Sequence, residues 1–169
     1  MPLSITELDR MPEARAAELL TACCGSSRWV TAMLTRRPFG SRDVLLAAAD
    51  SVWLTLGRTD WLEAFSHHPR IGEQTGAAPQ AARARAWSAS EQASVGSASE
   101  AERAEFATLN REYERRFGYI YIVCATGKPP EELLALARER LTHEPEVELA
   151  IAAKEQRRIM RLRLEKLLA

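Results

Sequence analysis

SEAERAEFATLNREYERRF, residues 99–117, is the stretch that decides what kind of fold this chain can adopt. Its apolar and aromatic side chains recur every three or four residues, which is the period of one face of an α-helix. These positions are Phe106, Leu109, Tyr113 and Phe117. Gly118 follows, where a helix commonly ends in a left-handed residue. The stretch predicts a long helix with one buried face.

Six further segments carry a helical pattern together with start or stop signals. Proline or a capping side chain stands near most of their beginnings, and glycine or proline follows most of their ends. The predicted helices span residues 12–24, 26–37, 43–56, 59–68, 130–141 and 145–168. Residues 70–85 contain two glycines and a proline but no apolar stripe, so we expect a loop with at most a helical turn.

The segment YIYIVCA, residues 119–125, is rich in β-branched and aromatic side chains, which favour a strand. The chain has no second strand-like run to pair with it, and a lone strand leaves its backbone polar groups unmatched. We therefore expect a buried extended segment or the start of a helix. The sequence as a whole predicts an all-α fold, a compact bundle of seven to eight helices in a single domain over residues 1–169.

Composition excludes several classes of function. The 23 basic and 23 acidic side chains cancel, which disfavours binding to nucleic acid or to an anionic membrane. No apolar run approaches the roughly 20 residues that span a bilayer, and the charged start is unlike a signal peptide. Three cysteines, two of them adjacent, suit a reducing compartment, so we expect a cytoplasmic protein. With three histidines and no CxxC pair, a metal site is disfavoured.

The peptide HHPRIGE, residues 67–73, carries the strongest chemical signal. A residue before proline is pushed out of the helical region, so His67 and His68 are expected at a helix exit, ahead of a glycine that permits a tight turn. Histidine is the side chain best suited to proton transfer near neutral pH. The alternative is that both imidazoles only stabilise the carbonyl end of the helix.

The peptide WSASEQ, residues 87–92, allows two interpretations. Ser88 and Glu91 stand three residues apart, which is the spacing of a capping box at a helix start. A helix start also presents free backbone N–H groups, so the same residues with Gln92 could hold an anionic ligand.

The peptide YIYIVCA also allows two interpretations, because its residues could line a pocket or only fill the core. Cys124 within it is expected to be a buried small hydrophobe rather than a nucleophile.

Taken in order, four peptides resemble one family. They are CCGSSRW with RPF (residues 23–29 and 37–39), HPRIG (68–72), WSxxEQ (87–92) and FGYIYIVCATGK (117–128). Their order and separations are similar to those of the 2-oxo-4-hydroxy-4-carboxy-5-ureidoimidazoline (OHCU) decarboxylases, and the ending RxxRIMRLRLEKLL extends the likeness. The resemblance implies an all-helical homodimer without metal or organic cofactor. It also implies conversion of the anionic ureidoimidazoline acid formed from urate into S-allantoin and carbon dioxide.

Site residues follow from the same resemblance. His68 is then the catalytic imidazole that handles protons, with Glu91 fixing a hydroxyl of the substrate. The substrate-binding residues implied are Pro69, Ser88, Ala89, Ser90, Glu91, Gln92, Tyr121, Ile122, Val123, Cys124 and Ala125. The chain departs from the common pattern in carrying Tyr121 where phenylalanine is frequent and Thr126 where some members have arginine.

Two other classes of function stay open on the sequence. One is a non-catalytic helical module whose last helix, with its leucines and arginines, binds a partner or a second copy. The other is a metal-dependent hydrolase using His67, His68 and a carboxylate such as Glu91. Adjacent residues on a helix point in different directions, which makes the two histidines poor ligands of one metal ion.

Overall fold

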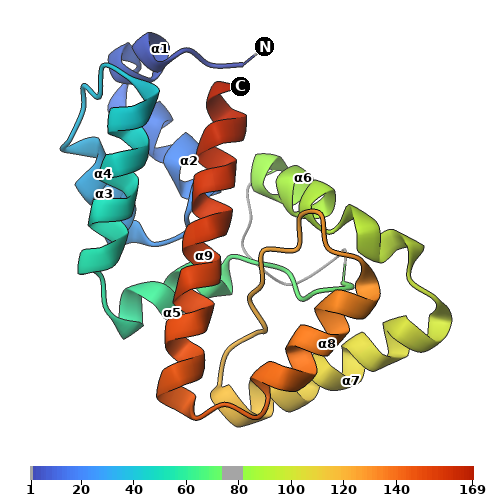
Figure 1. Cartoon of the computed structure of the whole chain (residues 1–169). Helices are drawn as coiled ribbons and strands as arrows, with labels where there is room; N and C mark the ends of the chain where they lie inside the picture. The colour runs from blue at the N-terminus through green and yellow to red at the C-terminus, as the bar shows by residue number, and fades with distance from the viewer. Residues whose placement is uncertain (1, 74–81) are drawn as a thin grey trace. The chain divides into compact units, whose positions relative to one another are not determined.

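Helices account for all the regular secondary structure of the described residues, which are 2–73 and 82–169 of this computed structural model (Figure 1). The elements are α1 (Ile5–Arg10), α2 (Glu13–Cys23), α3 (Ser27–Leu34), α4 (Arg42–Thr55), α5 (Arg58–Ser66), α6 (Ala82–Glu91), the 3₁₀ helix η1 (Ala93–Ser97), α7 (Glu100–Phe117), α8 (Pro130–Arg140) and α9 (Pro145–Leu168). The predicted all-α class is confirmed. Within the described ranges there are nine α-helices, against the seven to eight expected.

The chain divides into two compact units, which are described separately. One comprises the residues up to Ala64 together with Arg157–Ala169, and the other comprises Phe65–Gln156. All the candidate site residues belong to the second unit. The expectation of a single domain over residues 1–169 remains a prediction.

In the first unit, α3 packs against both α2 and α4 (Figure 1). Ser26 caps α3 and Ser41 caps α4, each side chain accepting a backbone N–H. Trp29 of α3 is fully buried, and its Nε1 donates to the carbonyl oxygen of Ala49 at 3.2 Å. Sequence interpretation missed α1, although Ser4 and Glu7 form a complete capping box at its start.

In the second unit, α7 packs along α8, and η1 contacts α8. Helix α7 matches the prediction closely, because Ser99 and Glu102 form a capping box at its start and Gly118, at φ 83°, ends it. The four residues of its predicted apolar face are all buried. Two of them, Tyr113 and Phe117, belong to a cluster of tilted and edge-on aromatic rings that also includes Phe65, Tyr119 and Tyr121.

Residues 119–125 form neither helix nor strand, and all but Ile120 are buried. Of the two alternatives that the sequence leaves open, the buried extended segment is confirmed and the start of a helix is not. The predicted loop at 70–85 is only partly tested. Residues 70–73 are a turn, 74–81 lie outside the described residues, and 82–85 belong to α6.

Candidate active site

His68 stands just beyond the end of α5, at the helix exit that the sequence predicts. Its backbone N–H donates to the carbonyl oxygen of Phe65 at 3.1 Å, and Pro69 then prevents the helix from continuing. The imidazole is half-buried, and its Nε2 lies 2.8 Å from Oε1 of Gln156. Gln156 lies on α9 and is fully buried. The ring is thus held by a side chain 88 residues away in the sequence.

The turn after His68 is fixed by contacts from two directions. Arg70 pairs with Glu114 of α7 through two hydrogen bonds, Nε to Oε2 at 2.7 Å and Nη2 to Oε1 at 2.8 Å. These hydrogen bonds outweigh desolvation and raise the pKa of Arg70. The buried Asn110 side chain donates to the carbonyl oxygen of Ile71 at 2.9 Å. The turn therefore has a defined position on α7.

Gly72 connects this turn to the WSASEQ peptide. Its φ of +86° lies in the left-handed region, as expected for a glycine that permits a tight turn. Its N–H donates to Oε1 of Gln92 at 3.2 Å. Two of the peptides singled out in the sequence are therefore in direct contact.

The capping-box interpretation of Ser88 and Glu91 is wrong. Both residues lie in the last turn of α6, and the N–H of Gln92 closes a helical hydrogen bond on the carbonyl oxygen of Ser88 at 3.0 Å. The alanine- and arginine-rich residues before Trp87 are good helix formers and start the helix earlier. A Ser-x-x-Glu pattern is a start signal only where the helix begins, so the proposed anion site at a helix N-terminus is lost as well.

What α6 presents instead is a buried polar pair. Ser88 and Glu91 are 4% and 8% exposed, and their three-residue spacing places them on one face of the helix. Ala89 and Ser90, between them, are exposed. The hydroxyl and the carboxylate therefore point into the protein.

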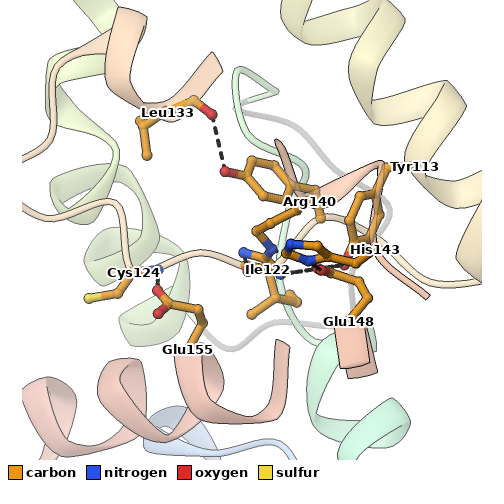
Figure 2. Close-up of polar contacts among 9 residues, drawn as sticks. Tyr113, Ile122, Cys124, Leu133, Arg140, His143, Glu148 and Glu155 are labelled. Carbon is orange, nitrogen blue, oxygen red and sulfur yellow. Dashed lines mark hydrogen bonds and ion pairs between the residues drawn. The ribbon is translucent and has the colours of Figure 1, made fainter. Parts of the chain in front are cut away.

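The segment Tyr121–Ala125 is entirely buried, and charged side chains bind its backbone. Nη1 of Arg140 donates to the carbonyl oxygen of Ile122 at 2.6 Å, and the N–H of Cys124 donates to Oε2 of Glu155 at 2.8 Å (Figure 2). Lys128 Nζ donates to the carbonyl oxygen of Cys124, also at 2.8 Å. These partners replace the ladder that a strand would have had.

Arg140 also belongs to a buried ionic cluster. The carboxylate of Glu148 accepts hydrogen bonds from Arg140 Nε, at 2.6 Å, and from the hydroxyl of Tyr113 (Figure 2). Its other oxygen lies 2.9 Å from Nδ1 of His143. Burial, and the carboxylate of Glu148, raise the pKa of Tyr113 against the opposing charge of Arg140. Tyr113 therefore stays a neutral donor to Glu148 across the physiological pH range.

Cys124 behaves as expected of a small buried hydrophobe. Its side chain is 8% exposed, and desolvation raises the pKa of the thiol despite the nearby Lys128. A thiol with a raised pKa supplies little thiolate near neutral pH. The geometry gives no support to nucleophilic thiol chemistry at this position.

Sequence interpretation missed three buried polar residues that position the site peptides: Arg140, Glu155 and Gln156. A signal was present in the last helix, where Glu148 and Glu155 are seven residues apart. They share a face with Leu149, Ala152 and Ile159, which are all buried. Charged residues within an apolar face indicate buried contacts, but the partner cannot be read from the helix alone.

Within residues 2–73 and 82–169, no group of three or more His, Cys, Asp or Glu side chains is arranged to hold a metal ion. His67, His68 and Glu91 therefore do not form such a group. Over the same residues, no helix is both long and apolar enough to cross a membrane.

Comparison with known proteins agrees with the motifs. The chain is 38% identical to the uric acid degradation bifunctional protein TTL of Arabidopsis thaliana over 86% of its own length. The matched region makes up only 45% of that protein, so the chain spans less than half of this relative. It is 27% identical to the 2-oxo-4-hydroxy-4-carboxy-5-ureidoimidazoline decarboxylase of Haloferax volcanii, covering 96% of this chain and 94% of that protein. A crystal structure of OHCU decarboxylase in the presence of (S)-allantoin matches with a TM-score of 0.76 and 35% identity, over 89% of this chain and 97% of that one.

An all-helical fold with an imidazole at a helix exit, seen alongside these relatives, indicates a helical decarboxylase. Residues 9–165 match the OHCU decarboxylase family, and the chain belongs to that family. The predicted family and the predicted class of enzyme, a carboxy-lyase of uric acid degradation, are thereby confirmed.

Proposed function

We propose that this chain decarboxylates OHCU to S-allantoin and that His68 handles the proton in that reaction. The observation that carries the proposal is the placement of His68, half-buried at a rigid helix exit with its Nε2 held at 2.8 Å by Gln156. An imidazole fixed in this way has a defined direction for proton transfer, and histidine is the side-chain type best suited to exchanging protons near neutral pH. OHCU is proposed as the substrate because the chain belongs to the OHCU decarboxylase family.

The chemistry needs no external electron sink. In the substrate, the bond to the departing carboxylate lies next to a ring C=N group. When that C–C bond breaks, carbon dioxide leaves and the electron pair moves into the C=N system, giving an enol-like intermediate. Protonation of one face of that intermediate then sets the S configuration. The enzyme contributes orientation, removal of water from the carboxylate and a positioned proton.

We assign the proton to His68 and the substrate hydroxyl to Glu91. Glu91 is 8% exposed on the inner face of α6, where a carboxylate is a strong hydrogen-bond acceptor. Pairing of Glu91 with protonated His68 would raise the pKa of the imidazole, as an opposite charge does. Ser88 and Gln92 are proposed to bind the carbonyl or ureido groups.

The remaining substrate contacts are assigned to the neighbouring segments. Pro69 is proposed to shape the wall next to His68. Backbone groups of Tyr121–Ala125 are proposed to contact the ring, because the segment is not helical and some of its amides and carbonyls are therefore not used in a helical ladder. Ala89 and Ser90 are assigned through the same family stretch.

The reaction is tested by following circular dichroism during urate breakdown by the upstream oxidase and hydrolase, with and without this protein. We expect rapid formation of a single allantoin enantiomer only when the protein is present, at a rate unchanged by a metal chelator. Slow racemic product at the same rate in both samples would contradict the proposed activity. A chelator-sensitive rate would contradict the proposal that no metal takes part.

The resemblance also supports two expectations about the protein in the cell. We propose that it acts as a homodimer in the cytoplasm, where the reducing environment suits its three buried free cysteines. Sedimentation equilibrium across a concentration series tests the first point. A molecular mass that stays at 18.9 kDa at all concentrations would contradict it.

A further inference from the structure

Gln156 is a buried amide at which only one of the two polar atoms has a partner. Its side chain is fully buried, and its Oε1 lies 2.8 Å from Nε2 of His68. Among the described residues, no acceptor lies within hydrogen-bond distance of its Nε2. Burying an amide N–H without a partner is unfavourable, and most such groups in proteins are satisfied. An apolar side chain of similar size would fill the same space without this cost.

We propose that Gln156 connects His68 to the substrate: Oε1 positions the imidazole, and Nε2 donates to an oxygen of the bound anion. The proposal rests on the decarboxylase function proposed above and adds a substrate-contacting residue on α9. Its neighbour Glu155 binds the backbone N–H of Cys124 at 2.8 Å. Adjacent residues of one helix therefore hold the catalytic imidazole and the segment proposed to bind the ring.

The amide oxygen determines which nitrogen of His68 exchanges the proton. An oxygen can only accept, so Nε2 of His68 carries a hydrogen and donates it to Gln156. Nδ1 is then the nitrogen that gains the proton in the imidazolium form and loses it again. The hydrogen bond to Oε1 survives this change, because Nε2–H is present in both forms. The ring can thus cycle its proton without losing its orientation.

The amide nitrogen explains why glutamine suits the position. The substrate is an anion whose carboxylate and carbonyl oxygens are acceptors, and a neutral N–H donor next to the imidazole can bind one of them. The binding of an acceptor would also satisfy the buried donor. Replacing the amide by a carboxylate keeps an acceptor for His68 but removes this donor and adds a repelling charge.

Three variants separate these roles. Gln156→Leu removes both contacts and is expected to lower kcat/KM at least tenfold. Gln156→Glu keeps an acceptor for His68 but loses the donor to the anionic substrate and repels it, so we expect a raised KM. The added negative charge should also raise the pKa of His68, which moves the alkaline limb of the kcat/KM profile to higher pH. Leu149→Ala, at an apolar buried position on the same helix, is the control for lost stability. It should lower Tm and leave the pH profile unchanged.

A measurement without turnover covers the case in which the Gln156 variants fold poorly. The chain has only three histidines, so nitrogen NMR of the labelled native protein can be assigned with His67→Ala and His143→Ala samples. Neutral His68 is expected to carry its hydrogen on Nε2. A neutral form protonated on Nδ1, or a Gln156→Leu variant with native kcat, KM and pH profile, would overturn the inference. Absence of activity in the native chain would instead contradict the proposed function.

Discussion

Arg140 at the end of α8 and Glu148 in the first turns of α9 form an ion pair almost completely removed from solvent, with side-chain exposures of 5% and 0%. Arg140 Nε donates to Glu148 Oε1, and Arg140 Nη1 reaches the carbonyl oxygen of Ile122. The pair thereby joins two helices to the segment proposed to contact the substrate. Since a buried charge without a partner is poorly stabilised, each residue makes the other necessary.

Arg140→Met is expected to lower the free energy of unfolding by about 3–5 kcal/mol, because it removes the guanidinium that pairs with the buried Glu148 carboxylate. The double variant Arg140→Met with Glu148→Leu should lose less than the sum of the two single changes. Urea titration measures all three. Arg138→Met on the same helix, whose partner Glu105 is at the surface, is the matched control and should cost at most about 1 kcal/mol. Equal losses at the two arginines would contradict the buried-pair account.

Gly72→Ala is expected to destabilise the turn after His68 by about 1–2 kcal/mol, since alanine is strained at a φ of +86°. Activity should fall as well, because the turn connects His68 to Gln92. Thermal melts and the allantoin assay measure the two effects. Gly57→Ala is the control, because Gly57 is outside the left-handed region and a Cβ there meets open space. Native activity in Gly72→Ala would show that the turn does not position the site.

Asp50 is expected to make stability depend on pH in the acid range. Burial alone raises its pKa, but the hydrogen bonds and charges of Arg157 and Arg161 outweigh burial and lower it. A lowered folded-state pKa gives stability that is present above the unfolded value of about 3.9 and is lost as pH falls through the folded value. The Tm difference between the native chain and Asp50→Asn should thus be full near neutrality and shrink below about pH 4. A constant difference would exclude this linkage.

The three cysteines are expected to resist alkylation in the folded protein. All three are buried, and desolvation raises the pKa of Cys24 to about 12 and that of Cys124 above its ordinary value. Iodoacetamide near pH 8 should therefore label the folded chain slowly and label every cysteine in denaturant. Mass spectrometry counts the adducts. Fast labelling of Cys124 in the folded state would reopen the question of thiol chemistry.

The elements that sequence predicts well are those with local signals. Helix α7 has a regular apolar face, a capping box at Ser99 and a glycine stop, so its bounds follow from short-range chemistry. For the segment 119–125, the absence of any partner strand argues against a strand, and the sequence leaves a buried extended segment and the start of a helix as alternatives. The wrong start at Ser88 shows the limit, because the same residues that cap one helix can lie in the last turn of another.

The polar contacts that position the site residues could not be predicted from the sequence. His68 is identified by its motif, but its partner Gln156 is 88 residues away, and nothing in the pattern of α9 pairs the two. Arg140 and Glu155 act on backbone atoms of the segment 121–125, and backbone acceptors carry no sequence signature. These long-range polar contacts depend on the tertiary packing of helices that were themselves predictable.

The central claim, that His68 handles the proton of the decarboxylation, is tested most directly by measuring kcat and KM for His68→Ala beside His67→Ala in the coupled dichroism assay. The two variants change adjacent half-buried imidazoles, so losses of folding should be similar. We expect His68→Ala to lose at least a hundredfold in kcat with a smaller change in KM, in line with general acid–base catalysis. His67→Ala should stay close to native. Native kcat in His68→Ala would contradict the account.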